Sequence, residues 1–149
     1  MNNEVNNIIN ISDSVLNYLK NILLQINNIC DLNKLIYTLA GIKNFTENES
    51  DLDYLKNICI LNNKEANIKR DKEYGDYQTN SELANKILLY LKTKNTYPQV
   101  IIEPTCGKGN FIIGCLNNFT PLTIYGIEIY KPYIWETKFK ILDYFIKNP

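Results

Sequence analysis

The sequence contains no histidine and a single arginine, Arg70, among its 149 residues. Without an imidazole there is no histidine base, no Ser-His catalytic triad and no histidine metal ligand. The 16 basic residues are balanced by 16 acidic ones, so the formal net charge is zero. A chain with this balance does not hold nucleic acid by bulk electrostatic attraction alone.

Four cysteines are present, but no two of them are spaced as Cys-x-x-Cys. This spacing predicts neither a zinc site nor a thioredoxin-like motif, and no metal is expected. The chain also lacks a basic segment followed by an apolar run at its beginning, and its apolar stretches are too short for a bilayer. We therefore expect a soluble cytoplasmic protein with no membrane segment, and its 45% hydrophobic composition suffices for a packed core.

Residues 1–62 are predicted to form a helical leader. From Ser12 to Cys30, apolar residues recur with the three- and four-residue spacing of an amphipathic helix. Asp31 is the expected N-cap of a second helix, Gly41 is its expected stop, and a weaker third helix follows. The pattern favours a small helical bundle packed on the rest of the chain, with a partner-binding helix pair as the alternative.

A polar segment, residues 63–76, breaks this periodicity and is interpreted as a linker because its charges alternate in sign. After the linker, Thr79 and Glu82 match a capping box that opens a helix. The expected apolar face of that helix consists of Leu83, Ala84, Ile87, Leu88 and Leu91.

The chain then changes to a strand-and-helix pattern. Residues 100–102 are wholly apolar, which is typical of a strand buried on both faces. A short helix is expected over 110–116, a second strand over 122–129 and a final helix over 133–147. This β-α-β-α order predicts the opening of a parallel α/β sheet within residues 77–149.

The segment from Glu103 to Phe111 carries the chemistry. A strand that ends in an acid, followed by a glycine turn and a helix, is how doubly wound sheets build a nucleotide site. The segment lacks the Gly-Lys-Ser/Thr of a phosphate-binding P-loop, and Ile112 stands where a dinucleotide fingerprint needs its third glycine. An acid at this place is repelled by a pyrophosphate but suits a ligand with an ammonium group.

Glu-Pro-Thr-Cys-Gly-Lys-Gly-Asn-Phe, residues 103–111, resembles the S-adenosylmethionine motif of adenine-specific (N6) DNA methyltransferases. That motif has the pattern Asp/Glu-Pro-x-Cys-Gly-x-Gly-x-Phe. Upstream, residues 74–79 resemble the family's Gly-x-aromatic-x-Thr motif, and downstream, residues 126–129 resemble its second-strand motif with an acid at the strand end. The resemblance covers residues 74–130 and implies a class I Rossmann-like fold, of which this chain contains an incomplete sheet.

The resemblance also implies a role for each matching residue, with S-adenosyl-L-methionine as the cofactor. Tyr77 and Thr79 are expected to hold its methionine carboxylate, and Glu103 its amino group. Glu128 is expected to accept from both ribose hydroxyls, with Ile129 against the adenine ring. The loop and its flanks supply the backbone approach and the packing behind the methionine moiety, through Pro104, Cys106, Gly107, Gly109 and Phe111.

Two departures from the family pattern stand out. Asn80 replaces the proline that follows the motif threonine, and the catalytic Asn/Asp-Pro-Pro-aromatic motif does not occur in the 149 residues. Asn148-Pro149 follows a predicted helix instead of a strand, so we do not interpret it as that motif. No catalytic residue is therefore assigned.

We expect this chain to be the cofactor-binding portion of a restriction–modification adenine-N6 DNA methyltransferase and to be inactive by itself. The enzyme is expected to meet double-stranded DNA through parts missing from this chain. One alternative is one subunit of a split enzyme, completed by a complementary polypeptide. The other is a cofactor-binding or interaction module without catalytic activity.

Overall fold

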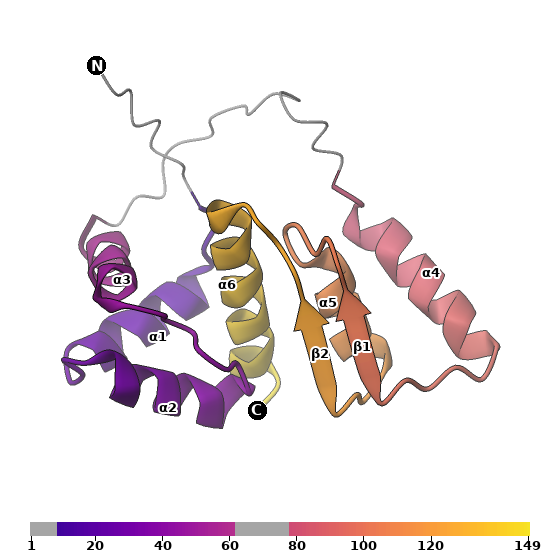
Figure 1. The fold of residues 1–149 in the computed structure, drawn as a ribbon, viewed down its shortest axis with the longest axis horizontal. Coiled ribbons are helices and arrows are strands. Elements are labelled where there is room, and N and C mark those ends of the chain that lie inside the picture. Colours follow the sequence, from indigo (N-terminus) through magenta and orange to yellow (C-terminus); the bar gives the residue numbers. More distant parts are fainter. Residues whose placement is uncertain (1–8, 62–77) are drawn as a thin grey trace, which may run out of the picture. The chain divides into compact units, whose positions relative to one another are not determined.

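The computed structural model describes residues 9–61 and 78–149, which form six helices and two strands (Figure 1). The elements are α1 (Asp13–Leu23), α2 (Ile29–Ala40), α3 (Glu49–Leu61), α4 (Ser81–Thr93), β1 (Val100–Glu103), α5 (Asn110–Asn118), β2 (Thr123–Gly126) and α6 (Lys131–Lys147). The chain divides into two compact units. Unit 1 comprises residues 1–68 and 141–149, and unit 2 comprises residues 69–140. The predicted linker, residues 63–76, lies outside the described residues.

Unit 1 contains the three leader helices, whose ends follow from local capping. Ser12 caps α1, but α1 ends at Leu23, so the apolar spacing that runs on to Cys30 belongs to two helices. The N-cap of α2 is Asn28, whose Oδ1 accepts from the backbone N–H of Asp31 at 2.9 Å. The predicted cap at Asp31 is therefore wrong. Gly41 ends α2 in the left-handed region at φ 66°, as predicted.

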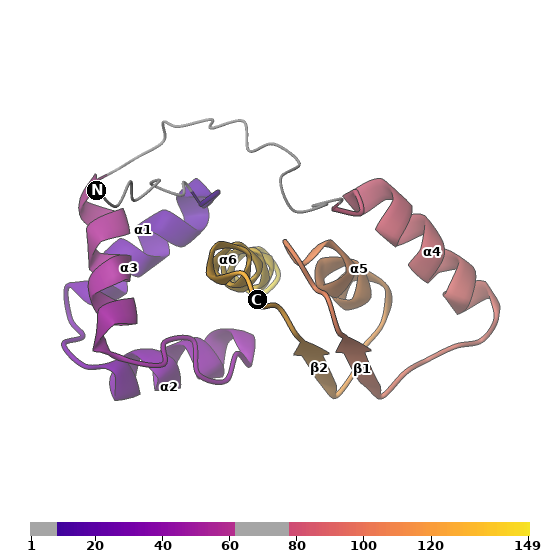
Figure 2. The same cartoon turned by 45° about the horizontal axis from the view of Figure 1, so that its top comes forward.

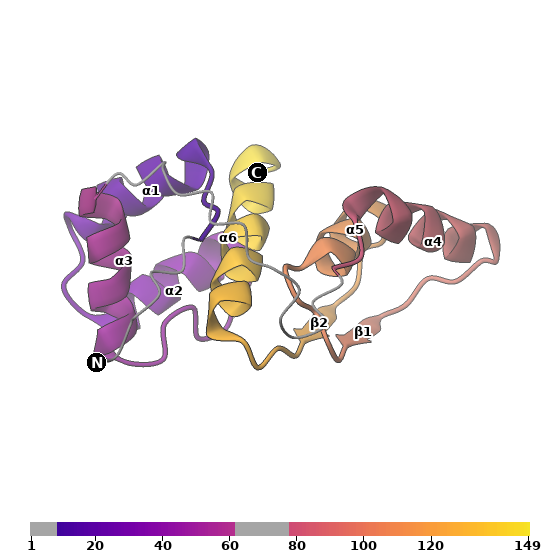
Figure 3. The same ribbon diagram turned by 90° about the horizontal axis from the view of Figure 1, so that it is seen from above.

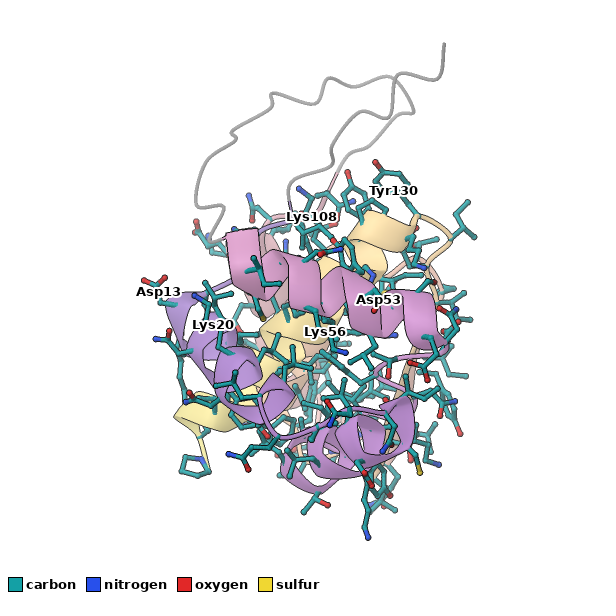
Figure 4. The ribbon with its side chains drawn as sticks, turned by 90° about the vertical axis from the view of Figure 1, so that its left-hand side faces the viewer. Asp13, Lys20, Asp53, Lys56, Lys108 and Tyr130 are labelled. Carbon is teal, nitrogen blue, oxygen red and sulfur yellow. The ribbon has the colours of Figure 1, made fainter. Side chains whose placement is uncertain are left out.

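The core of unit 1 is aliphatic, with one aromatic ring from the loop between α2 and α3. Phe45 supplies that ring and is fully buried. Beside it, Asn33 donates to the carbonyl of Thr46 at 2.7 Å and accepts from its N–H at 2.8 Å, which fixes the loop on α2. The helices contribute Val15, Leu16, Leu19, Leu32, Ile36, Ala40, Leu52, Leu55 and Cys59. Charged side chains of both signs lie on α1 and α3, among them Asp13, Lys20, Asp53 and Lys56 (Figure 4).

A polar cluster in unit 1 joins the start of α1 to the last turns of α6. The hydroxyls of Ser12 and Ser14 both donate to Asp143 Oδ1, the first at 2.6 Å. Lys147 pairs with the other oxygen of the same carboxylate at 2.5 Å. The last nine residues thus group with the leader, whereas the sequence boundary assigned them to the second domain.

In unit 2, α4 begins one residue later than the capping box predicts. Asn80, not Thr79, is the N-cap, and its Oδ1 accepts from the N–H of Leu83 at 2.7 Å. Glu82 instead pairs with Lys86 at 2.6 Å along the helix surface. Of the predicted apolar face, only Ala84 and Leu88 are buried. The other three apolar positions of the predicted helix, Leu83, Ile87 and Leu91, are exposed.

The strands β1 and β2 pair in parallel, from Val100 opposite Thr123 to Glu103 opposite Gly126 (Figure 2). Helices α4 and α5 lie side by side (Figure 3) and make the most extensive contact between elements. One face of the strand pair, through Ile101 and Ile124, packs against a core of Leu88, Cys115 and Phe119 from these helices.

The opposite face of the strand pair is open. Val100 is 55% exposed, Ile102 64% and Tyr125 57%, so the prediction of a β1 strand buried on both faces is wrong for this chain. Side chains alternate across a strand, and only one set of them meets a helix here. Helix α6 adds two stacked aromatic rings to the buried part of unit 2, Trp135 and Phe139, with centroids 5.6 Å apart.

No helix in the described parts of the chain has the length and apolar character needed to cross a bilayer. Within residues 9–61 and 78–149 there is likewise no group of three acidic or cysteine side chains arranged to hold a metal ion. All four cysteines, Cys30, Cys59, Cys106 and Cys115, are free thiols.

Candidate functional site

The glycine loop, residues 104–109, connects β1 to α5 through two left-handed residues. Gly107 has φ 49° and Gly109 has φ 76°, a region that side chains with a Cβ adopt only at a cost. The backbone N–H of Gly109 donates to the carbonyl of Cys106 at 2.8 Å, which closes the turn. Gly109 is also the N-cap residue of α5, so the loop leads directly into the positive end of a helix.

The loop is joined to the residues that follow β2 by continued backbone pairing. The N–H of Ile127 donates to the carbonyl of Glu103 at 2.9 Å, and the N–H of Cys106 donates to the carbonyl of Ile127 at 2.9 Å. The carboxyl ends of parallel strands meet at one edge of the sheet, which is where α/β proteins bind ligands. The two acids that the sequence singled out, Glu103 and Glu128, therefore lie at the same edge.

Glu128 is the residue that holds this edge together. Its Oε2 accepts from the backbone N–H of Gly107 at 3.0 Å, across 21 residues of sequence. Its Oε1 accepts from the N–H groups of Ile129 and Tyr130, each at 2.8 Å. A carboxylate has about four acceptor positions, so Oε2 retains capacity for a further donor.

Glu103 is half-buried and has a looser environment. Its Oε1 accepts from the N–H of Thr105 at 3.3 Å, near the long limit of an N–H···O bond. The pKa of the Cys106 thiol is raised by burial and further by the negative charges of Glu128 and Glu103. A thiol with a raised pKa is a poor nucleophile at neutral pH.

The segment before α4 meets the loop from its other side. Gln78 Oε1 accepts from the N–H of Lys108 at 3.0 Å. Asn110, the first residue of α5, donates from Nδ2 to the carbonyl of Thr79 at 2.8 Å and accepts from Lys140 at 2.9 Å. Thr79 thus lies beside the loop through its backbone, whereas Tyr77 lies outside the residues that the structure describes.

The other predicted residues differ in exposure. Phe111 is partly buried and packs against the core of Leu88, Cys115 and Phe119. Pro104 is exposed, and Ile129 is 96% exposed. The structure thus brings the three segments of the motif together, from Gln78 to Ile129, within unit 2.

Sequence reasoning missed the contribution of α6 to the loop. Thr137 is buried, and its Oγ1 donates to the carbonyl of Gly107 at 2.8 Å. The neighbouring Glu136 is also buried and lies 3.7 Å from the ammonium of Lys108. That ammonium is 5.1 Å from the centre of the Tyr133 ring. No local motif marks these residues, because their partners are about thirty positions away along the chain.

A parallel β-α-β unit with a glycine turn, an acid at the end of β1 and another shortly after β2 is the arrangement at which α/β proteins commonly bind nucleotides. A comparison with known proteins adds a partial sequence likeness to a methyltransferase. Over 76 residues, half of this chain, the sequence is 45% identical to the Type II methyltransferase M.NspV of Nostoc sp.. The matched region spans only 16% of that protein. No family model matches the chain, and no solved structure matches it.

Proposed function

We propose that this chain supplies the S-adenosyl-L-methionine-binding portion of a restriction–modification methyltransferase that acts on the N6 of adenine in DNA. The observation that carries the proposal is the hydrogen bond between Glu128 and the N–H of Gly107, which unites the loop and the second acid in one site. The likeness to a Type II methyltransferase supports the same reading. We propose in addition that the protein is soluble and meets DNA in the cytoplasm.

The donor and acceptor groups of the site fit this cofactor. S-adenosyl-L-methionine supplies the methyl group and presents an ammonium and a ribose diol as hydrogen-bond donors. Glu103, whose Oε1 accepts a long 3.3 Å bond from the N–H of Thr105, is suited to the ammonium, and the remaining capacity of Glu128 is suited to the diol. The glycine backbone lets a ligand approach the loop between these acids without a Cβ in the way.

For the rest of the motif, the proposal assigns Thr79 and Tyr77 to the methionine carboxylate and Ile129 to the adenine ring. Ile129 exposes nearly its whole side chain, so an aromatic ring laid on it would bury apolar area from both partners. Pro104, Cys106 and Phe111 shape the loop and its packing.

We propose further that methyl transfer needs residues outside these 149. The sequence contains no Asn-Pro-Pro or Asp-Pro-Pro, the group that the family resemblance assigns to the extruded adenine. The open strand face with Val100, Ile102 and Tyr125 favours a complementary methyltransferase polypeptide, because parallel sheets in α/β proteins are covered on both faces. Double-stranded DNA is then the substrate of the completed enzyme.

Calorimetric titration of the purified chain with S-adenosyl-L-methionine tests the cofactor site. We expect one saturable site, weakened at least tenfold by Glu128→Gln, because a charged acceptor contributes about 1.5–3 kcal/mol per hydrogen bond and about 1.4 kcal/mol is a factor of ten. Glu82→Gln is the matched control, since its partner Lys86 lies on the exposed surface of α4. Circular dichroism establishes that each variant is folded.

Absence of saturable binding by the folded wild-type chain would refute the cofactor assignment, and equal affinities for the two variants would refute the role of Glu128. A methyl-transfer assay on unmethylated duplex DNA tests the second proposal. The chain by itself should transfer no methyl group, and turnover by the chain alone would disprove the requirement for further residues.

A further inference from the structure

Thr137, in the middle of α6, forms a contact with the glycine loop that no motif assigns. From this contact we infer that Thr137 is a positioning residue for the cofactor loop: its hydroxyl fixes the Gly107–Lys108 peptide group in the orientation that the ligand meets. The inference rests on the proposed function, because it concerns the same site. It adds a residue from a helix that the family resemblance does not include.

The first argument is that Gly107 is held from both sides. Its N–H donates to Glu128 at 3.0 Å, and its carbonyl accepts from Thr137 Oγ1 at 2.8 Å. Glycine has more backbone freedom than any other residue, so a glycine at φ 49° keeps one orientation only if its polar groups are bound. Glu128 fixes the peptide group before Gly107, and Thr137 fixes the one after it.

The second argument is that the Thr137 hydroxyl donates to a residue outside its own helix. A buried threonine in a helix commonly donates to the carbonyl four residues earlier. Here the hydroxyl reaches a carbonyl 30 residues away instead, in a buried environment. Removing this donor would leave the buried carbonyl of Gly107 without its hydrogen bond from Thr137, which costs free energy.

The third argument is that the same side chain also contacts Gly109. A Cβ built on Gly109 would lie 2.8 Å from Thr137 Oγ1 and 2.9 Å from its Cγ2, so the two residues are in close contact. Threonine is branched at Cβ and therefore rotates little within a helix. A stiff, buried side chain that touches both glycines constrains the loop more than Gln78, whose side chain is exposed.

The test compares three variants of the 149-residue chain. Thr137→Val removes the hydroxyl and keeps the shape, and Thr137→Ser keeps the hydroxyl. Thr123→Val removes a hydroxyl from the end of β2 that pairs with Val100, away from the loop. Calorimetry measures the affinity for S-adenosyl-L-methionine, and amide hydrogen exchange followed by nuclear magnetic resonance measures protection of the Gly107 and Gly109 N–H groups without ligand.

We expect Thr137→Val to bind about tenfold more weakly and to exchange the two glycine amides faster, because one buried hydrogen bond is lost. The amide of Leu88, in α4 of the same unit, should keep its protection. Thr137→Ser should restore affinity and protection to within about a factor of two or three, and Thr123→Val should resemble the wild type. A general loss of stability of unit 2 would also expose the amides of α4, so it would not give this separation between loop and helix.

Equal exchange rates of the loop amides in wild type and Thr137→Val would overturn the inference, as would wild-type affinity in Thr137→Val. If the wild-type chain binds no S-adenosyl-L-methionine but the loop amides still respond to Thr137→Val, the proposed function fails while the positioning role holds. The two failures are therefore distinguishable.

Discussion

Replacing each left-handed glycine by alanine separates backbone strain from steric contact in this protein. Gly41, Gly107 and Gly109 have φ values of 66°, 49° and 76°. An L-residue in this region costs about 1–2 kcal/mol. The surroundings differ: a Cβ on Gly41 would meet nothing within 4 Å, and the atoms nearest to one on Gly107 would be those at the end of the exposed Gln78 side chain.

Gly107 has the shorter distances, down to 2.3 Å from Gln78 Oε1, but at Gly109 the neighbouring side chain is buried and cannot move aside. A Cβ there would lie 2.8–3.2 Å from three atoms of the buried Thr137 side chain, which cannot rotate away as Gln78 can. Overpacking of a well-packed site costs about 1–3 kcal/mol. We therefore expect Gly109→Ala to lower the free energy of unfolding by about 2–5 kcal/mol, and Gly107→Ala and Gly41→Ala by about 1–2 kcal/mol each.

Urea titration followed by the fluorescence of Trp135 measures the effect in unit 2. Trp135 is the only tryptophan, and it is buried against Phe139 in the unit that contains both loop glycines. Circular dichroism serves for Gly41→Ala, which lies in unit 1. In a Thr137→Ala background, Gly109→Ala should cost only the strain of about 1–2 kcal/mol. An unchanged cost in that background, or equal costs for Gly107→Ala and Gly109→Ala, would refute the steric argument.

Two further predictions concern titratable groups. Burial opposes the negative charge of Asp143, but hydrogen bonds from Lys147, Ser12 and Ser14 outweigh burial and lower the pKa of this carboxyl below 3.8. The ionised carboxylate therefore stabilises the fold above pH 3.8, and this stabilisation is lost as the pH falls through the folded-state pKa. Urea titrations should therefore find Asp143→Asn less stable than the wild type at about pH 7 and equally stable at about pH 2; a constant difference would contradict this linkage. Burial and two acidic neighbours raise the pKa of Cys106, so iodoacetamide at about pH 8 should modify the exposed Cys30 first. Peptide mapping that found Cys106 alkylated before Cys30 would contradict the raised pKa of Cys106.

The helix and strand positions followed from residue spacing, but their exact ends depended on which cap was used. Asn and Asp are nearly equal as N-caps, and this sequence contains 23 Asn, so several neighbouring residues compete at each helix start. The structure selects Asn28 over Asp31 and Asn80 over Thr79. The end of α2 at Gly41 was predicted correctly, because a left-handed helix end favours glycine over other residues.

Burial was harder to predict than helix or strand type. An apolar pattern identifies the face that prefers to be covered, but it does not tell whether the covering element is present in the same chain. Leu83 and Ile87 on α4 and Ile102 on β1 fit their patterns, yet they are exposed. The site residues also differ in how well the sequence predicts them. Glu103 and the glycines lie within one local motif, whereas Gln78 and Thr137 reach the loop only through the tertiary fold.

The two-stranded sheet also has a consequence for how the protein behaves in solution. In the described part of the chain, β1 and β2 pair only with each other, so each strand keeps one edge of backbone groups next to an apolar face. Such edges are templates for strand addition by another molecule. The chain has a formal net charge of zero and a calculated isoelectric point of 6.3, so little electrostatic repulsion keeps copies apart near that pH. Colloidal stability should therefore be lowest near pH 6.3 and should improve on dilution or at a more alkaline pH.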